Sequence, residues 1–107
     1  MKIVTICQRG NSRSVALAYL IKHELKHEAI AIGVRQHSAE TKKMLFDWAD
    51  VLILTDKRFL PEIPTEYHTK LKIYDVGRDK FFRGFDEGLL QTFRDYLKND
   101  PLVLVEF

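Results

Sequence analysis

The sequence predicts an α/β protein: a three-layer α/β/α domain with a four-stranded, mainly parallel sheet. Short apolar, β-branched runs alternate with amphipathic helical stretches, an order typical of parallel strands joined by right-handed crossovers. The run at positions 50–55, D-V-L-I-L-T, is almost continuously apolar, which indicates a central strand covered on both faces. The length of 107 residues indicates a single domain over 1–107.

The first unit of the chain is a strand, a tight loop and a helix. Residues 2–6 are short, apolar and rich in β-branched side chains, and they run directly into a polar stretch that begins at Cys7. From Arg13 onward the apolar residues recur at helical spacing. The predicted buried side of this helix consists of Leu17, Leu20, Ile21 and Leu25.

The middle of the chain predicts a second strand, a second helix and a third strand. Residues 28–32 form the strand, which ends at Gly33. Ser38 is the expected N-cap of the helix, and Met44, Leu45 and Trp48 form its apolar stripe. After the strand at 50–55, we expect Asp56 to cap a short helical turn, with a loop continuing to position 70.

The last third predicts a fourth strand at 71–76 and a final amphipathic helix that ends at Asn99-Asp100-Pro101. The buried face of that helix consists of Leu89, Leu90, Phe93, Tyr96 and Leu97. The apolar tail at 102–107 fits an added edge strand, a packed extension or an association surface.

Composition excludes several classes of protein. The 17 basic and 15 acidic residues are spread along the chain, so neither nucleic acid nor a membrane is an expected partner. The single cysteine excludes an intramolecular disulfide and a zinc site with paired cysteines. His23 and His27 have helical metal-ligand spacing but no evident thiol or carboxylate partner, so we expect no metal. No run reaches membrane-spanning length and no signal-peptide layout is present, which favours the cytoplasm.

The only cysteine opens a C-x5-R-S motif between the first strand and the first helix. Backbone N–H groups of such a loop and the helix N-terminus form an anion site, which also favours the thiolate and lowers the pKa of the thiol. Arg13 can grip two phosphate oxygens, and the Ser14 hydroxyl can donate to the sulfur. The expected phosphate-binding loop consists of Gln8, Arg9, Gly10, Asn11, Ser12 and Arg13.

At these residues the sequence resembles the low-molecular-weight protein tyrosine phosphatase family, which places a C-x5-R-S loop after an N-terminal strand. The resemblance extends over nearly the whole chain and includes the strand that ends in Thr55-Asp56. Gly10 and Asn11 lie one residue later than in that family, a spacing more like that of dual-specificity phosphatases. The resemblance implies a cysteine-dependent phosphatase that forms a phosphocysteine on Cys7 and requires no cofactor.

The family also implies a general acid and a substrate pocket. The acid is an Asp in a loop before the last helix, which matches Asp79, although the Pro that usually follows it is missing here. Asp75, nearer the strand end, is the alternative acid. Phe81 and Phe82 would line one wall of the pocket. The other wall would come from the loop after the second strand, with Arg35 and His37.

Three functions therefore remain open. The first is hydrolysis of phosphomonoesters, with phosphotyrosine on proteins as the main substrate class and dual specificity as an option. The second is arsenate reduction with an external thiol, because the chain has no further cysteine for a disulfide relay. The third is a catalytically weak phosphate-binding module. Expected ligands are a phosphorylated protein or a small phosphomonoester, and phosphate, sulfate or vanadate in the site.

Overall fold

The computed structural model describes residues 1–9, 13–76 and 87–100, and it contains the predicted parallel sheet. The sheet has four strands in the order β2-β1-β3-β4, and every neighbouring pair is parallel. The strands are β1 (Lys2–Cys7), β2 (Glu28–Gly33), β3 (Val51–Leu54) and β4 (Leu71–Ile73). The predicted fold class is therefore confirmed.

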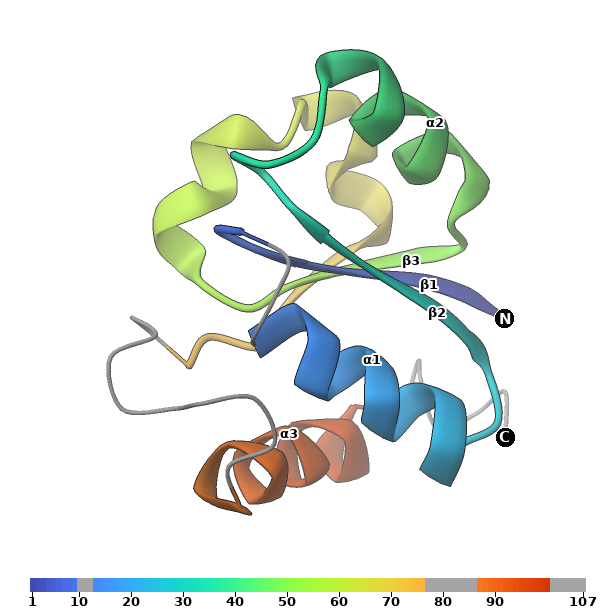
Figure 1. The fold of residues 1–107 in the computed structure, drawn as a ribbon, viewed down its shortest axis with the longest axis vertical. Helices are drawn as coiled ribbons and strands as arrows, with labels where there is room; N and C mark the ends of the chain where they lie inside the picture. The colour runs from blue at the N-terminus through green and yellow to red at the C-terminus, as the bar shows by residue number, and fades with distance from the viewer. Residues whose placement is uncertain (10–12, 77–86, 101–107) are drawn as a thin grey trace.

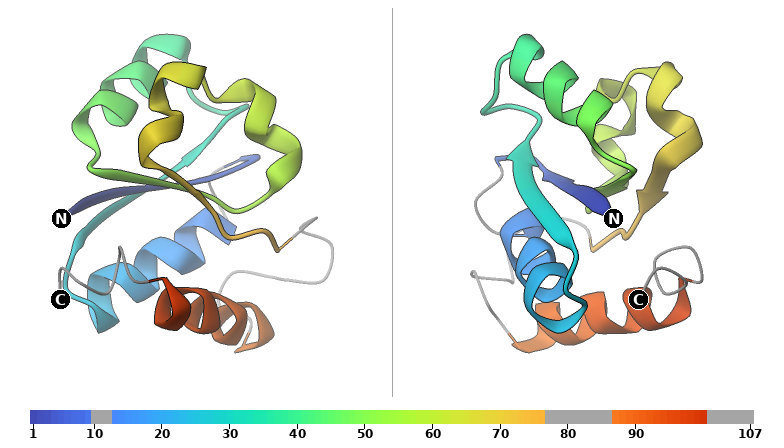
Figure 2. Two further views of the ribbon diagram at one scale, coloured as in Figure 1. Left: turned by 180° about the vertical axis from the view of Figure 1, so that it is seen from behind. Right: turned by 90° about the vertical axis from the view of Figure 1, so that its right-hand side faces the viewer.

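Helices cover both faces of this sheet. Helices α1 (Arg13–Glu24) and α3 (Glu87–Asn99) lie together on one face, below the sheet in Figure 1. Helix α2 (Ala39–Trp48) and two 3-10 helices, η1 (Lys57–Glu62) and η2 (Thr65–Lys70), lie on the other face (Figures 1 and 2). Each face has its own buried apolar cluster, so the sheet is the middle of three layers.

Continuous burial of the central strands explains why their sequences are apolar without alternation. All four residues of β3 are buried, and so are the last five of β1. Side chains on successive positions alternate between the two faces, so Ile3 and Ile53 join the cluster beneath α1 while Val4 and Leu52 join the cluster beneath α2.

Most helix expectations are confirmed, but the buried face of α2 differs from the prediction. The Ser38 side chain caps the helix by accepting a hydrogen bond from the Thr41 N–H. The predicted stripe is wrong at Met44, whose side chain is 70% exposed, and the fully buried residue of α2 is Phe46. Phe46 packs edge-on against Tyr67 from η2, so the burial of this face depends on a segment that lies far along the chain.

Two further segments correct the sequence prediction. The stretch before β4 contains η2 where a loop is predicted, and β4 ends at Ile73 rather than at position 76. Residues 74–76 nevertheless stay beside β3, because the Tyr74 N–H donates to the Leu54 carbonyl and the Val76 N–H donates to the Thr55 carbonyl. The tail at 102–107 lies outside the described residues. Within the described ranges, no helix is long and apolar enough to cross a membrane.

Candidate active site

Cys7 ends β1 and lies buried at the carboxyl edge of the sheet. Its side chain is within 3.0 Å of the Ser14 hydroxyl, measured from Sγ to Oγ. Ser14 is fully buried in the first turn of α1, and its carbonyl accepts a hydrogen bond from the Thr5 hydroxyl at 2.7 Å. Two hydrogen bonds to Ser14, from Thr5 and with Cys7, therefore join the end of β1 to the start of α1. This contact places the hydroxyl where the motif predicts it, beside the sulfur.

The loop after β2 supports the first residues of the phosphate-binding loop. The Val34 N–H donates to the Cys7 carbonyl, and the Arg35 N–H donates to the Gln8 carbonyl, each at 3.0 Å. Gly33, the residue before Val34, lies so close to Arg9 that a Cβ at Gly33 would be 2.2 Å from the Arg9 carbonyl carbon. Only glycine fits this approach. The sequence shows that glycine at the strand end but gives no indication that it supports the loop.

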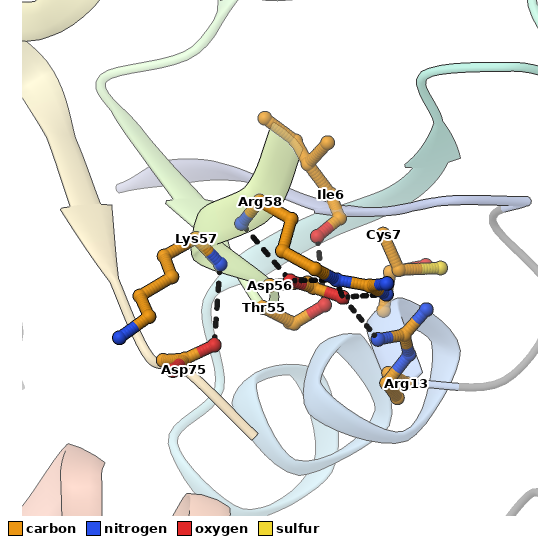
Figure 3. Close-up of polar contacts among 9 residues, drawn as sticks. Ile6, Cys7, Arg13, Thr55, Asp56, Lys57, Arg58 and Asp75 are labelled. Atoms are coloured by element: carbon orange, nitrogen blue, oxygen red, sulfur yellow. Dashed lines mark hydrogen bonds and ion pairs between the residues drawn. The ribbon is translucent and has the colours of Figure 1, made fainter. Parts of the chain in front are cut away.

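Arg13 begins α1 and carries a buried guanidinium group. Its side chain is 2% exposed, and its Nη1 atom lies 3.1 Å from Oδ2 of Asp56, which is 1% exposed (Figure 3). Asp56 follows the central strand β3, so the contact joins residues that are 43 positions apart. The carboxylate fixes one edge of the guanidinium of Arg13 at the N-terminus of α1, the end of a helix that favours anions.

Asp56 also holds a second arginine. Arg58 donates to both carboxylate oxygens from Nε, and it donates to Oδ2 from Nη2 (Figure 3). Burial by itself would raise the pKa of the Asp56 carboxyl, but hydrogen bonds from Arg58 and Arg13 lower it to about 2. The predicted cap is confirmed, because Asp56 accepts from the Arg58 N–H at the start of η1. The binding of the Arg13 and Arg58 guanidinium groups by this carboxylate has no signal in the sequence.

Asp75 lies at the neighbouring strand end. Its Oδ1 atom accepts a hydrogen bond from the Lys57 N–H at 3.2 Å, so the carboxylate also helps to hold the start of η1 (Figure 3). The Asp75 carbonyl accepts from the Tyr96 hydroxyl of α3 at 3.0 Å. The backbone that leaves the sheet toward position 77 is thus attached both to η1 and to α3.

Arg35 and His37 lie where the second wall of the pocket is predicted, in the loop after β2. Arg35 has an exposed side chain, and its backbone is bound to Gln8. The His37 ring is half-buried and contacts the backbone N–H and carbonyl of Gly33 through Nδ1. The other predicted site residues, which are Gly10, Asn11, Ser12, Asp79, Phe81 and Phe82, lie outside the described residues.

Comparison with known proteins identifies the fold. No protein-family profile and no curated protein sequence matches the chain. Among solved structures, the tyrosine phosphatase Wzb from Escherichia coli K30, in complex with phosphate, is similar with a TM-score of 0.68 and 16% identity, over 91% of this chain and 96% of that one. Vibrio vulnificus Wzb in complex with benzylphosphonate is similar with a TM-score of 0.62 and 14% identity, over 87% of this chain and 89% of that one. The chain therefore has the fold of these phosphatases, as the resemblance in its sequence predicts.

Proposed function

We propose that the protein is a cysteine-dependent phosphatase that hydrolyses phosphomonoesters, with phosphotyrosine on proteins as its main substrate class. The observation that carries this proposal is the arrangement at the β1–α1 junction. There the only cysteine lies 3.0 Å from the Ser14 hydroxyl, and a buried Arg13 begins the helix. The chain also shares its fold with two tyrosine phosphatases, which supports the same function. Those two proteins are in complex with phosphate and benzylphosphonate, which supports a phosphate-type ligand here.

In the first step the Cys7 thiolate attacks phosphorus in line with the leaving oxygen. An S–P bond forms as the P–O bond to the leaving group breaks, and a general acid gives its proton to that oxygen. Backbone N–H groups of the loop and Arg13 bind the three equatorial oxygens as their charge redistributes. Because Asp56 already fixes one edge of the guanidinium, little reorganisation is needed during this step.

In the second step water attacks the phosphocysteine and releases inorganic phosphate. The S–P bond breaks and the sulfur leaves as a thiolate, while the carboxylate produced in the first step takes a proton from the water. The Ser14 hydroxyl, 3.0 Å from Sγ, is placed to donate a hydrogen bond to that leaving thiolate. Ser14 is therefore expected to act mainly in this second step.

We assign the general acid to Asp79, with Asp75 as the alternative. The Asp75 carboxylate accepts a hydrogen bond from the Lys57 N–H and so helps to hold the start of η1, whereas Asp79 precedes the aromatic pair Phe81 and Phe82. A bell-shaped pH profile of kcat should lose its alkaline limb, which reports the protonated acid, in Asp79→Asn and keep it in Asp75→Asn. The reverse pattern would assign the acid to Asp75.

The proposal is tested most simply with para-nitrophenyl phosphate. We expect hydrolysis that vanadate inhibits, and loss of turnover in Cys7→Ser with phosphate binding largely retained. Turnover that persists in Cys7→Ser would overturn the cysteine mechanism. Phosphate binding without turnover in the unaltered protein would instead favour a phosphate-binding module, and arsenate reduction with glutathione would favour a reductase.

A further inference from the structure

We propose that Arg35 and Arg58 bind a carboxylate beside the phosphorylated residue of the substrate, so that acidic phosphopeptides are preferred to neutral ones. The inference rests on the proposed phosphatase function and adds a substrate class to it. We call the two arginines, together with the Phe59 ring that both of them contact, the arginine rim. The proposal is supported by the position of the rim beside the candidate nucleophile and by the exposure of its two arginines.

Arg58 brings positive charge to the surface directly beside the buried Arg13. The two guanidinium groups contact the same carboxylate oxygen, Oδ2 of Asp56 (Figure 3). The side chain of Arg58 is 43% exposed, whereas that of Arg13 is 2% exposed. The Asp56 and Asp75 carboxylates both raise the pKa of Arg58, and the Arg58 side chain nevertheless stays partly accessible to a substrate. A group bound there would adjoin the phosphate held by Arg13.

Arg35 approaches the phosphate-binding loop from the other neighbouring strand. Its backbone N–H donates to the Gln8 carbonyl, one residue after Cys7. Its side chain is 60% exposed and therefore accessible to a substrate. The ends of β2 and β3 thus each place an arginine next to the end of β1, where the candidate nucleophile lies.

Both arginines lie over the ring of Phe59. The Cζ atom of Arg35 lies 5.2 Å from the ring centroid, and that of Arg58 lies 5.3 Å from it. Phe59 itself is buried in the cluster beneath α2, so the ring is a fixed support. Stacking on an aromatic ring orients a guanidinium group, but two like charges on one ring repel each other. A carboxylate bound by both would reduce that repulsion and accept hydrogen bonds from both.

Within the described residues, the acidic side chain that pairs with Arg35 is that of Glu62. The closest nitrogen and oxygen are 3.9 Å apart, and both side chains are exposed. A pair of this kind contributes little, because water and salt screen it and its side chains remain flexible. An acidic group of a substrate can therefore replace Glu62 without a large loss.

The test compares two tyrosine-phosphorylated peptides that differ only in carrying Glu or Gln on either side of the phosphotyrosine. We expect kcat/KM for the acidic peptide to exceed that for the neutral peptide by about two- to fivefold, the range for an exposed ion pair. The ratio should fall toward one as salt is added. Fluorescence anisotropy with the Cys7→Ser variant measures the affinity for the same two peptides without hydrolysis.

Three variants identify the residues responsible. Arg35→Gln should bring the ratio close to one, and Arg58→Gln should lower it as well. Arg35 is the cleaner test, because Arg58 also holds Asp56. Glu62→Gln should raise the ratio. The matched control is Lys22→Gln, which removes one positive charge from the last turn of α1, at the far end of the helix from Arg13, and should leave the ratio unchanged.

Equal kcat/KM values and equal affinities for the two peptides would overturn the inference, as would a ratio unaffected by Arg35→Gln. The proposed function is tested separately by para-nitrophenyl phosphate, which carries no carboxylate. Turnover of that substrate without a peptide preference leaves the phosphatase assignment standing and removes the role of the rim. If the protein turns over no substrate but Cys7→Ser still binds the acidic peptide more tightly, the role of the rim is supported and the phosphatase function is contradicted.

Discussion

The centre of the candidate site and its rim are built in opposite ways. At the centre, four buried residues form two hydrogen-bonded pairs, Cys7 with Ser14 and Arg13 with Asp56. At the rim, Arg35 and Arg58 are exposed and rest on an aromatic ring. The difference implies that changes at the centre affect folding and chemistry together, whereas changes at the rim affect the choice of substrate.

The largest effect is expected for Asp56→Asn. Loss of the carboxylate leaves the buried guanidinium of Arg13 without its counter-charge, which should lower the free energy of unfolding by about 3 kcal/mol. The rate kcat should fall as well, because Arg13 is no longer oriented. The matched control is Glu24→Gln, which breaks an exposed pair with Arg94 and should cost less than about 1 kcal/mol. Urea unfolding measures the free energy of unfolding of both variants. Equal losses in the two would contradict the difference between the buried centre and the exposed surface.

The second prediction concerns the glycine beneath the loop. Gly33→Ala places a Cβ 2.2 Å from the Arg9 carbonyl carbon, so the phosphate-binding loop must shift. A displacement of about 1 Å in an active site lowers activity by about a hundredfold, and we expect kcat/KM to fall by that order. Gly88→Ala, in the exposed first turn of α3, is the control and should leave kcat/KM unchanged. Full activity in Gly33→Ala would show that the loop tolerates displacement.

A smaller effect is expected for Ser14→Ala. Removing the hydroxyl that lies 3.0 Å from Sγ should lower kcat by about tenfold, the value of one hydrogen bond to a charged group. Because the second step slows most, a rapid-mixing assay should show a burst of p-nitrophenol. Ser38→Ala removes the cap of α2 and serves as a control that lowers stability without a burst. A slow reaction with no burst would place Ser14 in the first step instead.

The smallest effect is a change of stability at acid pH. The pKa of Asp56 is lowered from 3.8 to about 2 in the folded protein, so its contribution is present above pH 3.8 and is lost as the pH falls toward 2. The difference in unfolding free energy between the unaltered protein and Asp56→Asn should therefore shrink over this interval. A difference that grows as the solution becomes more acidic would contradict the assigned ion pair.

Local patterns in the sequence explain which parts could be predicted. The apolar run of β1, the polar loop and the helical spacing after Arg13 are continuous in sequence, so the unit around Cys7 and Ser14 could be placed correctly. The prolonged apolar run of β3 likewise identified a central strand.

The remaining features depend on contacts between distant segments. The pairing of Arg13 with Asp56 exists because β3 lies beside β1, and no local pattern contains that information. The support of Arg9 by Gly33 depends in the same way on β2 lying on the other side of β1. Met44 is exposed because η2 presents Tyr67 to Phe46 instead, which the spacing within α2 cannot reveal.

The central claim is that Cys7 carries the phosphoryl group during turnover. The direct measurement is the mass of the protein after rapid acid quenching of a reaction with para-nitrophenyl phosphate, followed by peptide mapping. We expect one added phosphoryl group on the peptide that contains Cys7, and a larger phosphorylated fraction of that peptide in Ser14→Ala. Turnover without any phosphoryl group on that peptide, or turnover that persists in Cys7→Ser, would contradict it.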